Sequence, residues 1–346
     1  MRKSWIIQMM VFLALVSGCQ QEEILSAVPD PPTKQVEEVR IGFSMDTLVE
    51  DRWKKDRDLF KEAVESLGAE VMITAANGDD VLQVAQAETL IQSGIDVLVI
   101  VPHNAEATAA IVHKAHQAGI KVISYDRLVK NADIDLYVSF DNERVGELQA
   151  QAMLKEVSEG NFVFIGGADT DNNAHLLKRG VFSVLQPAID AGRVRIIYDQ
   201  WTEDWTPVNA KNNMTQALEI NNQQVDAIIA ANDATGGGVQ EALAAYGLEG
   251  KIPMTGQDAD LAGIRRIVSG DQLMTVYKPI RHLSQTAAEL AVTLARGEEV
   301  VTSSYVNNGK KEVPSVLIEP IAVTRETIDE TVIQDGYHSY QDVYGD

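Results

Sequence analysis

The sequence predicts an α/β protein of two doubly wound lobes, each built on a parallel sheet. Three observations predict this class. From Val39 onward, short β-branched runs alternate with amphipathic stretches; several of those stretches stop at a glycine; and the second half repeats the pattern of the first. At 346 residues the chain also exceeds what one hydrophobic core usually holds, so two lobes are expected.

Strands are expected where β-branched and aromatic residues form short runs. In chain order these runs are 41–43, 71–73, 97–101, 122–123, 137–138, 162–165, 196–197, 227–230 and 274–276. Apolar residues at helical spacing predict helices over 54–67, 81–92, 105–118 and 145–157. Gly68, Gly94 and Gly119 follow the first three of these helices and predict left-handed caps there.

The first 18 residues are typical of an export signal. Arg2 and Lys3 precede an apolar run that ends in small residues, and the run of about 12 residues is too short to span a bilayer. Cys19, the only cysteine, follows this run in the position typical of a bacterial lipoprotein. We therefore expect cleavage before Cys19 and a diacylglycerol anchor on its thiol; a buried or free thiol is the alternative.

Residues 19–38 predict a flexible tether because they are polar, acidic and rich in proline. The whole chain has a formal net charge of −22, with no basic stripe along it. A polyanion would be repelled by this charge, so the sequence argues against nucleic acid as a partner.

Polar residues recur at the carboxyl ends of corresponding strands in the two halves. The segments 41–46, 97–104 and 119–126 parallel 163–169, 227–233 and 250–258. Ligands of open α/β sheets bind at this edge, so we expect one cleft between two lobes. A single continuous enzyme domain predicts no such doubling.

The residue types at these ends suit a sugar. Carboxylates accept the hydrogen of a hydroxyl, while amides and guanidinium groups satisfy its oxygen. An indole ring covers the apolar face of a pyranose. Of the four tryptophans, Trp53, Trp201 and Trp205 lie outside the signal.

Each motif also has a purely structural interpretation. Arg52 and Trp53 could pack on the start of the following helix, and Asp126 with Arg127 could form a loop ion pair. Asn232 could simply cap a helix. Trp201 and Trp205 could be core or hinge residues. Their joint occurrence at strand ends in both halves favours a binding site.

Catalytic signatures are missing from the sequence. It contains no P-loop, no nucleophile elbow and no zinc-peptidase helix, and Gly236–Gly238 is a weak phosphate signal. His113 and His116 share a helix face without a neighbouring carboxylate or cysteine cluster, so no metal site is expected. Asp126 and Asp258 leave paired-carboxylate glycoside hydrolysis as the one enzymatic alternative. We expect no catalytic residue and no cofactor.

Seven segments of the sequence match the motifs of one known protein family: 52–58, 124–127, 139–143, 171–174, 231–235, 256–263 and 275–279. Together they closely resemble the D-xylose-binding proteins of ABC importers, and the match extends from about Val39 to about His338. Such proteins are type I periplasmic binding proteins, whose two Rossmann-like lobes are joined by a three-crossover hinge and close on a sugar.

The resemblance implies a set of sugar-binding residues. Trp53 and Trp205 would stack on the sugar, and Trp201 would be a structural neighbour. The polar contacts would come from Arg52, Asp126 and Arg127 in the first lobe, Asn173, Asn232 and Asp258 in the second, and Lys278 at a crossover. The tail from Tyr340 has no counterpart in this resemblance.

The resemblance also implies the lobe boundaries, with crossovers near 141–142, 278–279 and 306–307. The N-terminal lobe would comprise 39–141 with 279–306, and the C-terminal lobe 142–278 with 307–346. The expected partners are D-xylose or a related monosaccharide, an ABC permease and, through Cys19, the extracytoplasmic face of a bacterial membrane, on the cell surface or the periplasmic side. A monomer is expected. The alternative is a sensor that presents bound sugar to a histidine kinase or chemoreceptor.

Overall fold

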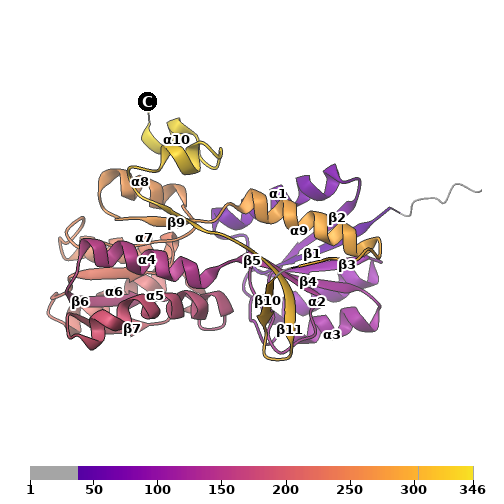
Figure 1. The fold of residues 1–346 in the computed structure, drawn as a ribbon, viewed down its shortest axis with the longest axis horizontal. Coiled ribbons are helices and arrows are strands. Elements are labelled where there is room, and N and C mark those ends of the chain that lie inside the picture. Colours follow the sequence, from indigo (N-terminus) through magenta and orange to yellow (C-terminus); the bar gives the residue numbers. More distant parts are fainter. Residues whose placement is uncertain (1–37, 303, 346) are drawn as a thin grey trace, which may run out of the picture. The chain divides into compact units, whose positions relative to one another are not determined.

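Seven strands form the larger sheet of the computed structural model, which describes residues 38–302 and 304–345 (Figure 1). The strand order is β10-β11-β5-β4-β3-β1-β2, and only the β10–β11 pair is antiparallel. The strands are β1 (Arg40–Met45), β2 (Glu70–Ala75), β3 (Val97–Ile100), β4 (Lys121–Tyr125), β5 (Leu136–Phe140), β10 (Ser304–Asn307) and β11 (Glu312–Ile318).

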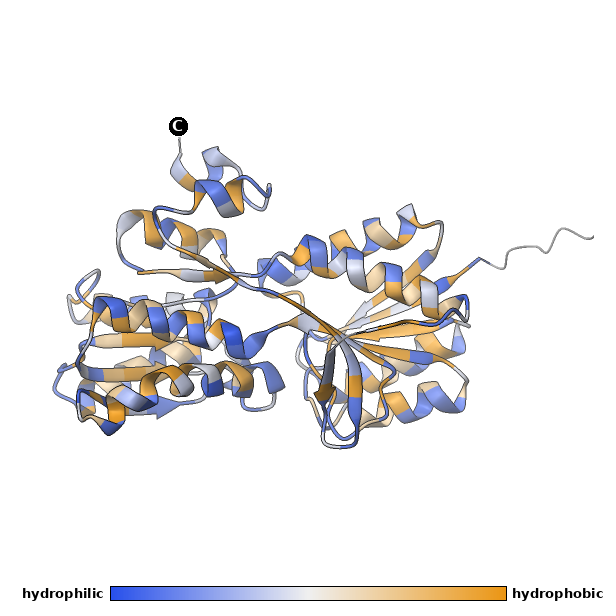
Figure 2. Ribbon diagram, in the orientation of Figure 1, coloured by the Kyte–Doolittle hydropathy of each residue, from blue (hydrophilic) through white to orange (hydrophobic). Residues whose placement is uncertain are grey.

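Helices cover both faces of this sheet because its central strands are apolar on both sides. Val97 and Val99 of β3 belong to the core under α1 (Asp51–Ser66) and α9 (Ile280–Ala295). Leu98 and Ile100 belong to the opposite core, under α2 (Asp80–Gln92) and α3 (Ala109–Gln117). Figure 2 shows the apolar strands between helices whose outer faces are polar.

The second sheet has the order β7-β6-β8 and is parallel. Its strands are β6 (Gly160–Ile165), β7 (Val194–Gln200) and β8 (Ala227–Ala230). Alternate residues of β6 again serve two cores. Phe162 and Phe164 pack under α4 (Asn142–Glu156) and α5 (Asn172–Asp190), whereas Val163 and Ile165 pack under α6 (Pro207–Ile220) and α7 (Asp233–Ala245).

Several smaller elements complete the half of the fold that contains the second sheet. Isolated parallel bridges join Ile228 to Met254 and Thr255 to Met274, and β9 (Thr275–Tyr277) pairs antiparallel with β12 (Ile321–Val323). The remaining elements are the 3-10 turn η1 (Glu203–Trp205), α8 (Leu261–Ser269), the π-helical turn η2 (Asp329–Ile333) and α10 (Tyr340–Tyr344).

The sheet memberships correct the expected third crossover at 306–307. The chain stays in the first sheet through β10 and β11, because β11 pairs with β5 from Ser315↔Tyr137 to Ile318↔Phe140. It reaches the second sheet's half only at β12. We therefore propose lobes of 38–141 with 279–318 and of 142–278 with 319–345, called below the first and second lobes.

Three helices end just before a glycine, as predicted. Gly68, Gly94 and Gly119 have φ of +73°, +78° and +77°, a backbone conformation that side chains with a Cβ rarely adopt. The two helices predicted from 54 and 145 start three residues earlier than expected, at Asp51 and Asn142. The helix predicted from 105 starts later, at Ala109.

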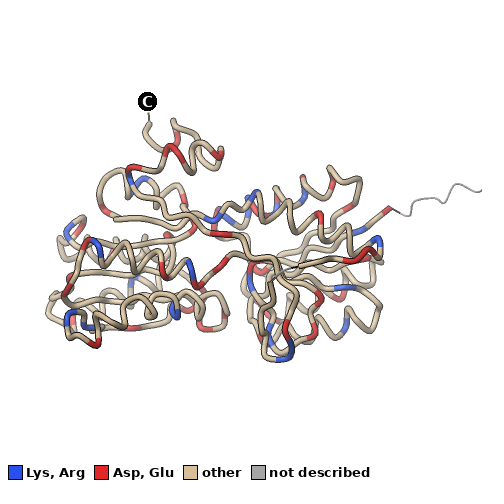
Figure 3. Tube along the Cα trace, in the orientation of Figure 1, with Lys and Arg blue, Asp and Glu red and all other residues tan. Residues whose placement is uncertain are grey.

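Charged residues of both signs are scattered along the trace (Figure 3). Among the described residues, no helix is both long and apolar enough to cross a membrane. The expected signal, the lipid-bearing Cys19 and most of the tether lie outside the described residues.

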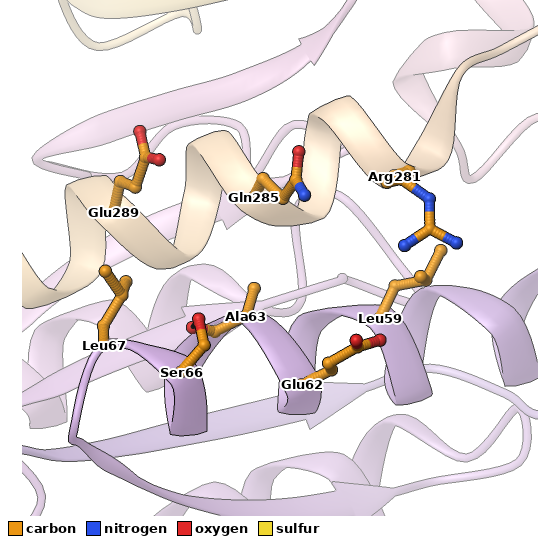
Figure 4. Close-up of a pocket in the computed structure, with 8 residues that line it drawn as sticks. All are labelled: Leu59, Glu62, Ala63, Ser66, Leu67, Arg281, Gln285 and Glu289. Carbon is orange, nitrogen blue, oxygen red and sulfur yellow. Dashed lines mark hydrogen bonds between the residues drawn. The ribbon is translucent and has the colours of Figure 1, made fainter. Parts of the chain in front are cut away.

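A groove of about 280 Å³ lies between α1 and α9, where Leu59, Ala63 and Leu67 face Arg281 and the polar side chains after it (Figure 4).

Candidate functional site

The first lobe contributes two pairs of side chains that follow neighbouring strands. Arg52 and Trp53 open α1, shortly after β1, and Asp126 and Arg127 follow β4 directly. Because β1 and β4 both pair with β3 in a parallel sheet, their carboxyl ends lie on one edge. All four side chains are buried, with exposed fractions of at most 6%.

The second lobe contributes residues from the corresponding edge of its own sheet. Asn173 lies in the first turn of α5, Trp205 ends η1, and Asn232 is the N-cap of α7. Asp258 and Lys278 precede α8 and follow β9, respectively. Asn232, Asp258 and Lys278 come just after a strand or bridge, whereas Asn173 and Trp205 lie further along the connections that follow β6 and β7.

All nine predicted sugar-binding residues line one small cavity of about 30 Å³, room for about two water molecules. They are Arg52, Trp53, Asp126, Arg127, Asn173, Trp205, Asn232, Asp258 and Lys278. A larger cavity of about 400 Å³ adjoins it and shares Arg127 and Trp205 among its lining residues. The inner cavity is narrow because cationic side chains reach across it to carboxylates.

Arg52 is the centre of that network. Its guanidinium donates to the carboxylates of Asp56 (3.2 Å), Asp126 and Asp258 (3.2 Å), and the last of these belongs to the second lobe. The Lys278 ammonium lies 3.6 Å from the same Asp258 carboxylate. Burial alone would raise the pKa of Asp126, but the charges of Arg52 and Lys278 lower it, so the group is ionised.

Arg127 forms the second connection between the lobes. Its guanidinium contacts Asp46 of the first lobe (2.6 Å) and Asp171 of the second (2.9 Å). The expected alternative, an ion pair between Asp126 and Arg127, is wrong for a geometric reason. Asp126 has a left-handed φ of +58°, and its carboxylate instead accepts from Arg52 and from the Asn173 amide (3.0 Å).

The two stacking candidates are both buried, with 5% of Trp53 and 7% of Trp205 exposed. The guanidinium carbons of Arg52 and Arg127 lie 4.4 and 5.1 Å from the Trp53 ring centroid, within cation–π range. Trp205 donates from Nε1 to Asp171 (3.2 Å). Its ring packs on Gly167, where an added Cβ would lie 2.2 Å from ring atoms, so a larger residue there would displace the ring.

Two structural interpretations hold alongside the site. Asn232 does cap α7, accepting from the Thr235 amide (2.8 Å) in a reciprocal capping box, and it also lines the cavity. Trp201 lies outside the inner cavity, with its ring 4.8 Å from that of His175 and 4.5 Å from the Lys178 ammonium. His116 bonds Asp135 (2.8 Å), and no group of three or more potential metal ligands occurs in the described part of the chain.

Sequence reasoning missed four residues that line the inner cavity: Glu50, Asp171, Gln257 and Asp260. Asp171, Gln257 and Asp260 lie inside the segments 171–174 and 256–263, which carry the resemblance. Their position in these segments, after a strand or bridge, was the available signal. Asp171 has the clearest contacts, because it accepts from both Arg127 and Trp205. Burial and the nearby Asp233 carboxylate raise the pKa of Asp260 well above its ordinary value.

His103 lies between carboxylates of the two lobes at the outer cavity. Its Nδ1 is 3.0 Å from Asp46, and its Nε2 is 3.9 Å from Asp204. The hydrogen bond to Asp46 raises the pKa of His103 above its ordinary 6.5. A histidine whose folded pKa is raised stabilises the fold fully below its unfolded pKa, and this contribution is lost as the pH rises through the folded pKa.

We therefore expect His103→Gln to lower the free energy of unfolding more at about pH 5.5 than at about pH 8.5. Urea unfolding at the two pH values measures the difference. His113→Gln is the matched control, since His113 is exposed and its ring nitrogen lies 2.9 Å from the Gln117 amide, away from any carboxylate partner in the described chain. An equal loss for His103→Gln at both pH values would contradict the ion pair.

Comparison with known proteins adds independent support. A family model described as a periplasmic binding protein domain matches residues 41–299. The chain is 51% identical over 301 residues to the D-xylose-binding periplasmic protein of Escherichia coli (strain K12), covering 87% of this chain and 91% of that relative. It is 50% identical over 307 residues to the D-xylose-binding periplasmic protein of Haemophilus influenzae, covering 89% and 92%.

A solved structure agrees with the fold. The carbohydrate transporter solute-binding protein of Chloroflexus aurantiacus, crystallised with D-glucose, superposes with a TM-score of 0.83 at 34% identity, covering 88% of this chain and 98% of that one. The family match, the relatives and the superposition all extend over both lobes. The chain therefore belongs to the periplasmic binding protein family.

Proposed function

We propose that this chain is an extracytoplasmic solute-binding protein that captures D-xylose, or a closely related monosaccharide, and delivers it to an ABC-type permease. One observation carries the proposal: the nine polar and aromatic residues that the resemblance implies, from both lobes, line one cavity. The names of the two curated relatives support D-xylose as the first sugar to test.

Binding in this cavity requires the ion pairs to exchange partners. Arg52 bridges Asp126 and Asp258, and Lys278 lies 3.6 Å from Asp258, which leaves a space of about 30 Å³, too small for a pentose ring. Sugar hydroxyls would replace part of these contacts, donating to the carboxylates and accepting from the cations. Entry would require the lobes to separate, and closure around the sugar would follow.

We propose a binding role without catalysis. Hydrolysis of a glycosidic bond needs one carboxylic acid kept protonated at working pH. Asp126 is the wrong group for this, because Arg52 and Lys278 lower its pKa. Asp258 is held by the same two cations, at 3.2 and 3.6 Å. Both carboxylates are therefore arranged to accept hydrogen bonds from a ligand.

The proposal includes an anchor and a place of action. A diacylglycerol on Cys19 would hold the lobes at the extracytoplasmic face of a bacterial membrane through the tether 19–38, within reach of the permease. Two acyl chains suffice for stable attachment, whereas one gives marginal binding. We further propose that the protein acts as a monomer, because the predicted site is complete within one chain.

Calorimetric titration with D-xylose, D-glucose, D-ribose and L-arabinose tests the sugar. We expect D-xylose to bind most tightly, because the chain is 51% and 50% identical to two D-xylose-binding periplasmic proteins. A clear preference for another sugar would overturn D-xylose while leaving a monosaccharide site. No binding of any of the four would overturn the proposed function.

A further inference from the structure

The loop that carries Asp258 has an unusual backbone. Asp258 and the next residue, Ala259, have φ of +85° and +53°, a left-handed region that residues other than glycine enter at an energetic cost. Asp258 lines the inner cavity and contacts both Arg52 and Lys278. Its carboxylate can hold this place only if the surrounding structure fixes the turn.

The C-terminal segment supplies that support. The Tyr337 hydroxyl donates to the Asp258 carbonyl (3.3 Å), and His338 Nε2 donates to the Ala259 carbonyl (2.7 Å). Both carbonyls of the strained turn are thus bound by consecutive residues near the chain end. Tyr337 is itself packed against Tyr277, with the two ring centroids 5.0 Å apart.

The same segment is anchored in the second lobe. Ile328, Val332 and Val343 share a buried cluster with Ala259 and Tyr277. Arg265 of α8 also donates to the Asp342 carbonyl at 2.6 and 2.8 Å. The support behind Asp258 is therefore part of a packed layer.

A side chain of the first lobe reaches this segment from outside the cavity. Lys55 of α1 donates from Nζ to the Tyr337 carbonyl (2.9 Å), and the same nitrogen lies 3.7 Å from the centroid of the Tyr337 ring. Lys55 is three residues after Arg52, on the helix that carries both Arg52 and Trp53. Neither Lys55 nor Tyr337 lines the inner cavity.

We propose that Lys55 and Tyr337 are positioning residues that join the lobes when they close and hold Asp258 within reach of the sugar. This inference rests on the proposed function and deepens it. Closure would bring the Lys55 ammonium onto the Tyr337 ring and carbonyl, and Tyr337 would transmit the contact to the backbone of Asp258. Sugar affinity would then depend on residues that never touch the sugar.

Lys55→Met tests the contact, because methionine keeps most of the side-chain volume and removes the charge. We expect it to weaken D-xylose binding about tenfold, mainly by faster dissociation, since the closed form loses a charged hydrogen bond and a cation–π contact. Lys55→Arg should restore most of the affinity. Tyr337→Phe keeps the ring and should weaken binding about threefold, through the lost hydroxyl bond to Asp258.

Lys54→Met is the matched control on the same helix. Lys54 pairs at 2.9 Å with Asp51 of its own turn, and its side chain is 49% exposed, so we expect D-xylose affinity to change less than about twofold. A merely structural role for Lys55 would lower thermal stability without a change in the dissociation rate. Equal D-xylose dissociation rates in Lys55→Met and Lys54→Met would overturn the proposal.

A distance measurement separates this inference from the proposed function. Spin labels at Val81→Cys in α2 and Val208→Cys in α6, positions 80% and 67% exposed, report the separation of the lobes once Cys19 is replaced by serine. Without sugar, we expect Lys55→Met to populate longer label distances than Lys54→Met. If no sugar binds the wild type, the proposed function fails and this comparison still decides the role of Lys55. Identical distance distributions in the two variants would overturn it.

Discussion

Replacing Arg52 with methionine is expected to lower the free energy of unfolding by about 3–5 kcal/mol and to abolish sugar binding. The Arg52 side chain is 5% exposed, and its guanidinium pairs with three buried carboxylates, those of Asp56, Asp126 and Asp258. Removing the cation leaves these charges without their main partner in a site of low dielectric constant. Chemical denaturation of the variant measures the loss.

Arg57→Met is the matched control for this prediction. Arg57 lies one and a half turns further along α1 and pairs with Asp58 at the surface, where 36% of its side chain is exposed. Its removal should change stability by less than about 0.5 kcal/mol. The loss in Arg52→Met should also shrink as the pH falls, because the uncompensated carboxylates take up protons; burial already raises the pKa of Asp56 to about 6. Equal free energies of unfolding for Arg52→Met and Arg57→Met would contradict the proposed ion-pair network around Arg52.

Replacing Trp205 with alanine is expected to weaken D-xylose binding at least about thirtyfold, roughly 2 kcal/mol. The indole lines both the inner and the outer cavity and is held in place by Asp171 and by the close backbone at Gly167. Its loss removes the apolar surface that would cover one face of the sugar. Calorimetric titration measures the change in the dissociation constant.

Trp201→Ala is the control, since Trp201 lies four residues away and outside the inner cavity. We expect its D-xylose affinity to stay within about threefold of the wild type. Trp205→Phe should lose less affinity than Trp205→Ala, because a smaller aromatic ring remains. A dissociation constant for Trp205→Ala equal to that for Trp201→Ala would remove Trp205 from the proposed site.

Much of the first half of the fold could be predicted from periodicity and glycine. The runs at 41–43 and 97–101 are continuous and apolar because their strands are covered on both faces. The runs at 162–165, 196–197, 227–230 and 274–276 also match strands, whereas β10, β11 and β12 were not predicted. β11 contains Pro314, which normally argues against an inner strand, yet Pro314 pairs with Tyr305 in the antiparallel hairpin while Ser315 to Ile318 pair with β5.

The nine residues that the resemblance implies line one cavity together with four others, whereas the connections among them could not be predicted from the sequence. Strand ends and residue types identified Arg52, Asp126 and Asp258, which the structure brings to one cavity. Their pairing depends on backbone conformation. Asp126 and Asp258 adopt left-handed φ angles, and such angles at aspartate cannot be read from residue type alone.

The support that the Asp258 turn receives from distant residues could not be predicted from the sequence either. Tyr337 and His338 lie about 80 positions from the turn that they hold, and no local pattern links the two segments. Asp171 lies within a motif but was not predicted to belong to the site, because its contact with Arg127 depends on how the lobes meet and its contact with Trp205 on the turn after β7.

Titration of the wild-type protein with D-xylose, combined with small-angle X-ray scattering of the same samples, tests the central claim most directly. Residues from both lobes line the proposed site, so one sugar should bind per chain and the radius of gyration should decrease when it does. Failure to bind D-xylose, or binding without any compaction, would contradict a cleft that closes on its sugar.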